Sequence, residues 1–271
     1  MTKNVGSKEL KKSHLRLMML ETVPNQSLTC IPKVSMEVDD TSDLAYKVKK
    51  PLPAKSFALY ITGQPGSGKT SALLGMLLSR PSKKSPDKPR FYYRYFDHIY
   101  LISNSLQTLP LDKLMLCPER VHNEFCDTTL QSIIETEREG PNLNNCLIID
   151  DCIRDITNSK EMAKLILARR HATQNPCEEG QAGMAVMITS QVYNWLPLGL
   201  RKNMSHLMIF RTENQRELNS IKKEVMADLS DVQADNVMKT AWSKPHSFLF
   251  IDASKPTKDR YYACFDKIIV S

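Results

Sequence analysis

The sequence lacks several features that mark whole classes of protein. No apolar run reaches the roughly 18 residues that a membrane-spanning helix requires, and the short apolar stretch from Leu15 to Leu20 is broken by Arg16. The seven cysteines include no C-x-x-C pair, and an odd number cannot all pair within one chain. No internal repeat is present. These absences argue against membrane, secreted disulfide-rich and repeat proteins, and they predict a soluble intracellular protein with free thiols and no membrane partner.

Charge is distributed unevenly along the 271 residues. Residues 1–94 carry 17 Lys and Arg against 7 Asp and Glu, whereas residues 95–271 carry 20 against 23. The formal net charge of +7 therefore arises from the N-terminal part of the chain. A concentrated basic region favours a polyanionic partner, because neutralising phosphates releases counterions. A solvated, flexible tail is the alternative that charge alone leaves open.

The character of the sequence changes near residue 55. Residues 1–54 mix Lys, Pro, Ser and Asp without sustained periodicity, which predicts a basic N-terminal arm or linker. Residues 55–271 alternate short apolar runs with amphipathic stretches, and 41% of the chain is hydrophobic. That is enough to build one sizeable core, so this part is predicted to be a single domain.

The alternation of patterns predicts the fold class. We expect strands at 56–62, 97–103, 146–149, 184–189 and 207–210, and helices at 68–79, 128–139, near 159–170 and near 214–229. Residues 248–252 and 261–265 are predicted to form a C-terminal β-hairpin. Strands that alternate with helices favour an α/β fold whose mostly parallel sheet carries helices on both faces. Such sheets bind ligands at the carboxyl ends of their strands.

One motif predicts a phosphate site. The G-x-x-x-x-G-K-[ST] pattern is matched by Gly63, Gln64, Pro65, Gly66, Ser67, Gly68, Lys69 and Thr70. A predicted strand runs into the motif and a predicted helix leaves it. The glycines let successive N–H groups point at phosphate oxygens, and the helix N-terminus adds partial positive charge. Lys69 is expected to reach the β- and γ-phosphates and the Thr70 hydroxyl to bind Mg²⁺, so residues 55–271 are predicted to be a P-loop NTPase domain.

A second motif supplies acids for the same site. Leu147–Asp151 (LIIDD) reads as a buried strand that ends in two carboxylates. Asp150 is expected to hold Mg²⁺, directly or through water. Asp151 is expected to point to the other side of the strand and to orient or deprotonate the attacking water.

The segment after these acids carries a family resemblance. Ala168-Arg169-Arg170-His171 is followed by the strand MAVMITS with Gln191 at its end, then by Leu196-Pro197 and Arg201-Lys202-Asn203. This order resembles the FtsK–HerA class of DNA-pumping ATPases, and most of all its viral genome-packaging branch in poxviruses and other large DNA viruses. The resemblance covers roughly residues 56–252, and it implies a RecA-like fold of the FtsK–HerA type.

The resemblance also implies roles and partners. Gln191 would contact the lytic water or the γ-phosphate. Arg170, with Arg169 as the second choice, would act as an arginine finger on a neighbouring subunit's nucleotide, and Arg201 is the rival candidate. ATP and Mg²⁺ are the implied cofactors. The implied partners are double-stranded DNA, other copies of the chain in a ring, and a capsid portal or vertex. The expected location is the host cytoplasm or viral factory, or the virion.

Two other functions remain open at this stage. One is a P-loop transferase such as a small-molecule kinase, although no clear Arg-rich lid segment is present. The other is a non-enzymatic, nucleotide-gated DNA-binding protein. The basic loop from Lys83 to Arg94, which ends in FYYR, is also open to two interpretations: nucleic-acid contact, or packing of FYYRYF into the core, which we prefer.

Overall fold

The computed structural model describes residues 22–23, 48–54, 56–81, 90–109, 114, 116–179 and 182–270. The described strands are β1 (Thr22–Val23), β2 (Ala58–Thr62), β3 (His98–Ser103), β4 (Val121–His122), β5 (Asn144–Asp150), β6 (Gly183–Ser190), β7 (His206–Phe210), β8 (Phe248–Asp252), β9 (Tyr261–Ala263) and β10 (Asp266–Ile268). The described α-helices are α1 (Lys69–Leu78), α3 (Asp127–Glu139), α4 (Ile153–Ile156), α5 (Lys160–Ala168), α6 (Leu198–Arg201), α7 (Gln215–Val225) and α8 (Asp231–Ala241). Short 3-10 turns are η1 (Leu106–Thr108), η2 (Pro118–Arg120), η3 (Tyr193–Trp195) and η4 (Thr257–Asp259).

The strands described form one ten-stranded sheet in the order β1-β10-β9-β8-β7-β2-β6-β5-β3-β4. The run from β7 to β4 is parallel, and β8, β9, β10 and β1 extend it with antiparallel pairings. Every residue of β2 and of β6 is buried, as expected for central parallel strands with both faces covered. The predicted α/β fold with a mostly parallel sheet is confirmed.

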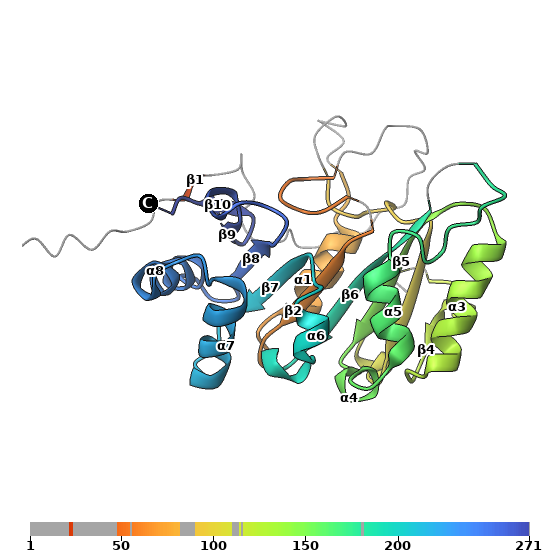
Figure 1. Ribbon diagram of the computed structural model, residues 1–271, viewed down its shortest axis with the longest axis horizontal. Coiled ribbons are helices and arrows are strands. Elements are labelled where there is room, and N and C mark those ends of the chain that lie inside the picture. The colour runs from red at the N-terminus through yellow and green to blue at the C-terminus, as the bar shows by residue number, and fades with distance from the viewer. Residues whose placement is uncertain are drawn as a thin grey trace, which may run out of the picture.

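Each face of the sheet carries its own hydrophobic core. In β2, Leu59 and Ile61 pack with α1, whereas Ala58 and Tyr60 face the helices of the other side. That other side is covered by α3, α5, α6, α7 and α8 (Figure 1). Strand side chains alternate between faces, so the P-loop helix α1 and the remaining helices flank the same strands from opposite sides.

The aromatic segment before β3 packs into the core on the α1 side. Phe91, Tyr92 and Phe96 are buried there, and Phe57 stacks on Tyr92 with ring centroids 5.5 Å apart. The preferred interpretation of FYYRYF is therefore confirmed, although the segment forms turns and not a strand. The lysines that precede it, at 83, 84 and 88, lie outside the described residues.

The last residues of the predicted arm pack against the domain. Residues 48–54 contact the domain: Leu52 is buried in the α1-side core, and the Tyr92 hydroxyl donates to the Pro53 carbonyl at 2.7 Å. β1 pairs with β10. The rest of the predicted basic arm lies outside the described residues. The structure thus puts 48–54 against the sheet, and the division at residue 54 stays a prediction.

The C-terminal part contains the predicted hairpin and one helix that we did not predict. β8 and β9 pair antiparallel across η4, as expected. α8 begins with a capping box, in which the Ser230 side chain accepts from the Gln233 N–H and the Gln233 side chain accepts from the Ser230 N–H. Among the helices described, none is long and apolar enough to cross a membrane.

Candidate nucleotide site

The P-loop connects β2 to α1 and depends on glycine at fixed points. A side chain at Gly63 would bring its Cβ within 2.5 Å of the Phe210 Cβ, so the close approach of β7 requires glycine there. Gly68, which caps α1, has a φ of 107°, a conformation open to glycine and strained for other residues. The loop thereby ends on the N-terminus of a ten-residue helix, where backbone N–H groups and the helix dipole favour an anion.

The amine of Lys69 lies between the loop and the acidic strand. Its Nζ donates to the Gly63 carbonyl at 2.6 Å and to the Gln64 carbonyl at 3.1 Å. Burial lowers the pKa of Lys69, and the nearby charges of Asp151 and Asp150 oppose that shift. Both carboxylates therefore lie near the amine, which brings together the two motifs that the sequence placed about 80 residues apart.

Asp150 ends β5 and is held by the strands on either side of it. Its Oδ1 accepts from the Thr189 hydroxyl at 2.6 Å, and its Oδ2 accepts from the Ser103 hydroxyl at 3.2 Å. The side chain is buried. Neither Thr189 nor Ser103 was predicted from the sequence, although each is a polar residue at or near the carboxyl end of an apolar strand.

Asp151 and Gln191 form a directly bonded pair. The Gln191 Nε2 donates to the Asp151 Oδ2 at 2.6 Å, and the Asp151 N–H donates to the Thr189 hydroxyl at 3.1 Å. Asp151 follows the last residue of β5 and has a φ of 57°, so the alternation of the strand does not extend to it. That Asp151 points to the other side of the strand from Asp150 stays a prediction.

The register of the sheet explains why these groups meet. β6 lies between β2 and β5, with Thr62 opposite Ser190 and Asp150 opposite Thr189. The carboxyl ends of the three parallel strands are therefore level. The P-loop, Gln191 and the two acids follow these ends in that order across the sheet, with Gln191 next to the acidic strand as predicted.

Arg170 lies at the opposite edge of the sheet. α5 starts near the carboxyl ends of the strands and ends near their amino ends, where the Arg169 carbonyl accepts from the Met184 N–H at 3.0 Å. Arg169 itself donates from Nε to the Ser56 carbonyl at 2.9 Å, just before β2. Arg170 is exposed. This helix end lies at the amino ends of the central strands β2 and β6.

Arg201 is buried in a network with α7. Its Nε and Nη2 donate to the two oxygens of Glu224 at 2.8 and 2.7 Å, and its Nη1 donates to the Leu196 carbonyl. The Tyr193 ring lies against the guanidinium, 5.0 Å from centroid to Cζ, and the Tyr193 hydroxyl donates to Glu224 at 3.0 Å. Burial opposes the charge of Arg201, but Glu224 outweighs it and raises the pKa of the guanidinium. This geometry favours Arg170 over Arg201 as the candidate finger.

Comparison with known protein families shows which family includes this chain. The sequence model of the poxvirus A32 protein family matches residues 45–268. The chain belongs to this family. The match spans the whole described sheet apart from β1, and it includes the P-loop, both acids and Gln191. No match was found among curated proteins.

Solved structures with the same fold include a viral packaging enzyme. B204, the DNA-packaging ATPase from Sulfolobus turreted icosahedral virus, aligns with a TM-score of 0.52 and 15% identity, over 80% of this chain and 98% of that one. The genome packaging NTPase B204 from Sulfolobus turreted icosahedral virus 2, in complex with ATP-gammaS, aligns with a TM-score of 0.51 and 17% identity, over 79% of this chain and 96% of that one. At this identity the likeness shows the fold.

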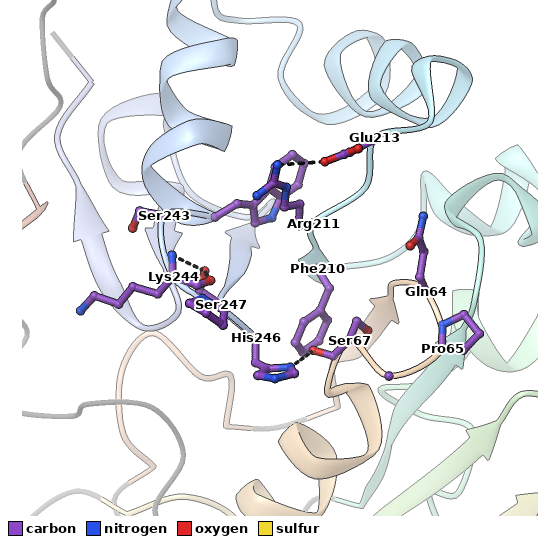
Figure 2. A pocket seen from close by; sticks show the side chains of 13 residues that line it. Gln64, Pro65, Ser67, Phe210, Arg211, Glu213, Ser243, Lys244, His246 and Ser247 are labelled. Atoms are coloured by element: carbon purple, nitrogen blue, oxygen red, sulfur yellow. Dashed lines mark hydrogen bonds and ion pairs between the residues drawn. The ribbon is translucent and has the colours of Figure 1, made fainter.

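A cavity opens beside the P-loop, on the side away from the acids. It has a volume of about 490 Å³ and lies between the loop, the end of β7 and the turn that joins α8 to β8 (Figure 2). This cavity was not predicted from the sequence. Its turn, residues 242–247, comes from nearly 180 residues after the P-loop, and the WSKPHS sequence carries no motif.

Proposed function

We propose that this member of the poxvirus A32 protein family is an ATP-hydrolysing DNA translocase that packages viral double-stranded DNA into a capsid. The observation that carries the proposal is the meeting of Lys69, Asp150 and the Asp151–Gln191 pair at one edge of the sheet. P-loop ATPases need a phosphate cradle, an acid for the metal and groups that orient water, and this edge provides all three.

The residues divide the work of hydrolysis among them. The N–H groups of the P-loop bind the phosphates of ATP, and Lys69 leaves the Gly63 and Gln64 carbonyls to pair with the β- and γ-phosphates. Asp151 accepts a proton from the attacking water. Gln191, bonded to Asp151, orients that water and detects loss of the γ-phosphate.

Thr70 and Asp150 are suited to hold Mg²⁺. Both offer oxygen ligands, which Mg²⁺ prefers, and Asp150 is kept in place by the hydroxyls of Thr189 and Ser103. When bound, the ion neutralises negative charge on the phosphates. The two hydroxyls would fix the carboxylate for direct coordination or for a water bridge.

Assembly and DNA binding are part of the same proposal. Arg170 lies at the amino ends of the strands, whereas the P-loop of the same chain lies at their carboxyl ends. This separation favours action of Arg170 on a neighbouring copy in a homo-oligomeric ring. The positive charge of residues 1–94 suits the phosphates of double-stranded DNA. A capsid portal or vertex would be the docking partner, in the host cytoplasm, the viral factory or the virion.

Phosphate release with and without double-stranded DNA tests the proposal. The expected result is Mg²⁺-dependent ATP hydrolysis that DNA stimulates and that Lys69→Ala abolishes. ATP binding without turnover under both conditions would identify a nucleotide-gated DNA-binding protein. Phosphate transfer that requires a small-molecule acceptor would identify a transferase.

A further inference from the structure

The chain leaves the sheet directly after β6, and Gln191 is the first residue outside the strand. Val192 comes next, and η3 begins at Tyr193. The end of β6 is joined to the P-loop, because the Gly63 N–H donates to the Ser190 carbonyl at 3.2 Å. The Gln191 amide has no strand to hold it, so its position depends on how the chain just after it is held.

Tyr193 is held by α7 at two points. Its N–H donates to the Glu217 Oε2 at 3.0 Å, and its hydroxyl donates to the Glu224 Oε2 at 3.0 Å. From the other direction, the Tyr60 hydroxyl lies 3.1 Å from the Val192 carbonyl and 3.0 Å from the Tyr193 carbonyl. Glu217 and Glu224 both belong to α7, so this one helix holds the backbone of Tyr193 as well as the tip of its side chain.

Glu217 is a buried carboxylate with a single hydrogen-bond donor. It is 6% exposed, and among the described residues its carboxylate accepts from the Tyr193 N–H alone. It lies in the first turn of α7, where the helix dipole favours negative charge. Burying a carboxylate still costs free energy, and a neutral amide would satisfy one N–H. What the charge adds is a stronger hydrogen bond, which fixes the backbone two residues after Gln191.

We propose that Glu217 is a positioning residue for hydrolysis, which acts through the Tyr193 N–H to hold Gln191 against Asp151 and the attacking water. The inference rests on the proposed ATPase function and on the role given there to Gln191. The Gln191 Nε2 donates to the Asp151 Oδ2 at 2.6 Å, so a shift of the backbone at this point disturbs that bond. Glu217 thereby links the N-terminus of α7 to the groups that orient water.

Two substitutions separate the reach of Glu217 from its charge. Glu217→Gln removes the charge but keeps an oxygen that can accept from the Tyr193 N–H. Glu217→Asp keeps the charge in the first turn of α7 but is one methylene shorter, so it loses the bond. Glu137→Asp is the matched control, because it makes the same change at a glutamate that is 4% exposed and bonded to three side chains outside the candidate site.

Phosphate release over a range of ATP concentrations gives kcat and KM, and thermal unfolding gives Tm. Glu217→Asp should lower kcat on the order of 10²-fold, the scale of a displacement of about 1 Å in a catalytic group. Its KM for ATP should not change, because the P-loop and Lys69 are untouched. Glu217→Gln should have a kcat closer to that of the wild type than to that of Glu217→Asp. Glu137→Asp should lower Tm and leave kcat unchanged.

A double variant tests whether Glu217 acts through Gln191. Added to Gln191→Ala, Glu217→Asp should slow hydrolysis no further, because the side chain that it positions is already absent. A loss that adds in full to that of Gln191→Ala would overturn the proposal.

Three other results would also overturn it. The first is a wild-type kcat in Glu217→Asp. The second is a kcat in Glu217→Gln as low as that expected for Glu217→Asp, which decides the matter even where Glu217→Asp does not fold. The third is an equal loss of kcat in Glu137→Asp, since reduced stability would then explain both. If the wild type releases no phosphate, the proposed ATPase function itself fails, and that outcome is distinct from failure of the role of Glu217 alone.

Discussion

Substitution of Arg201 tests whether this residue has a structural or a catalytic role. Its guanidinium is 8% exposed, donates twice to Glu224 and once to the Leu196 carbonyl, and lies on the Tyr193 ring. Removing one partner of a buried pair costs about 3–5 kcal/mol, because the other charge stays buried and unpaired. Arg201→Ala should therefore lower the free energy of unfolding by about 4 kcal/mol, a large part of the roughly 5–15 kcal/mol typical of a domain.

Two further variants serve as controls for the loss of stability expected in Arg201→Ala. Arg201→Met with Glu224→Gln removes both charges but keeps an acceptor for the Tyr193 hydroxyl, so it should recover at least half of the lost stability. Arg211→Ala breaks the exposed pair with Glu213 and should cost less than about 1 kcal/mol. Urea unfolding of the nucleotide-free protein measures all three.

The result that would refute this account is equally specific. If Arg201→Ala unfolds like Arg211→Ala while ATP hydrolysis collapses, the guanidinium is not a structural anchor and the finger role returns to Arg201. When Arg201→Ala is mixed with Lys69→Ala, the activity should not exceed that of Arg201→Ala alone. The reason is that a folding defect in one subunit is not repaired by a neighbouring subunit.

The remaining predictions concern the nucleotide site and assembly. Lys69→Ala should abolish hydrolysis and leave the circular dichroism spectrum unchanged; wild-type turnover in this variant would rule out the P-loop assignment. Asp151→Asn should bind Mg·ATP but lose about 10²–10⁴-fold in turnover, as loss of a general base does, whereas Asp150→Asn should weaken Mg²⁺-dependent binding; calorimetry that finds the opposite would reverse the two roles. Arg170→Ala should bind ATP but hydrolyse it on the order of 10³-fold more slowly, and titration with Lys69→Ala should restore activity; no rescue with mixed assembly demonstrated would place Arg170 in cis or in a structural role.

The sequence predicts the parallel strands well because they are buried on both faces. Predicted and observed bounds agree within about two residues for β2, β3, β5, β6 and β7, since such strands are continuous apolar runs. β1, β4 and β10 were missed. They are two or three residues long and include Lys, Asp and Thr, so only pairing with a distant strand defines them.

α8 shows a signal that was present but unused. Ser230 and Gln233 form a capping box, and Ala234, Val237, Met238 and Ala241 are buried at helical spacing. Small and polar residues between them weaken the apolar pattern, which hid the helix from a search for large side chains. The capping pattern three residues apart would have located its start.

In the candidate site, too, some features follow from local sequence motifs and others only from tertiary packing. The P-loop and Asp150 follow from local motifs, because one strand and one turn create their geometry. The orientation of Asp151 depends on one backbone angle, and the partner of Arg201 lies on α7, 23 residues away. The cavity beside the P-loop joins segments from opposite ends of the domain. These features arise from tertiary packing, which no local pattern encodes.

The position of Arg170 constrains how copies of the chain could assemble. It follows α5 at the amino edge of the sheet, while the P-loop and acids lie at the carboxyl edge. β6 spans eight residues between these edges, and at roughly 3.3 Å per residue the separation is about 25 Å. Arg170 can therefore meet a P-loop only if the amino edge of one copy faces the carboxyl edge of the next. When such contacts repeat head to tail, they are heterologous, and they generate a closed ring when the rotation between copies closes. A two-fold dimer could make the contact only by packing two sheets antiparallel, so that each Arg170 meets the P-loop of the other copy.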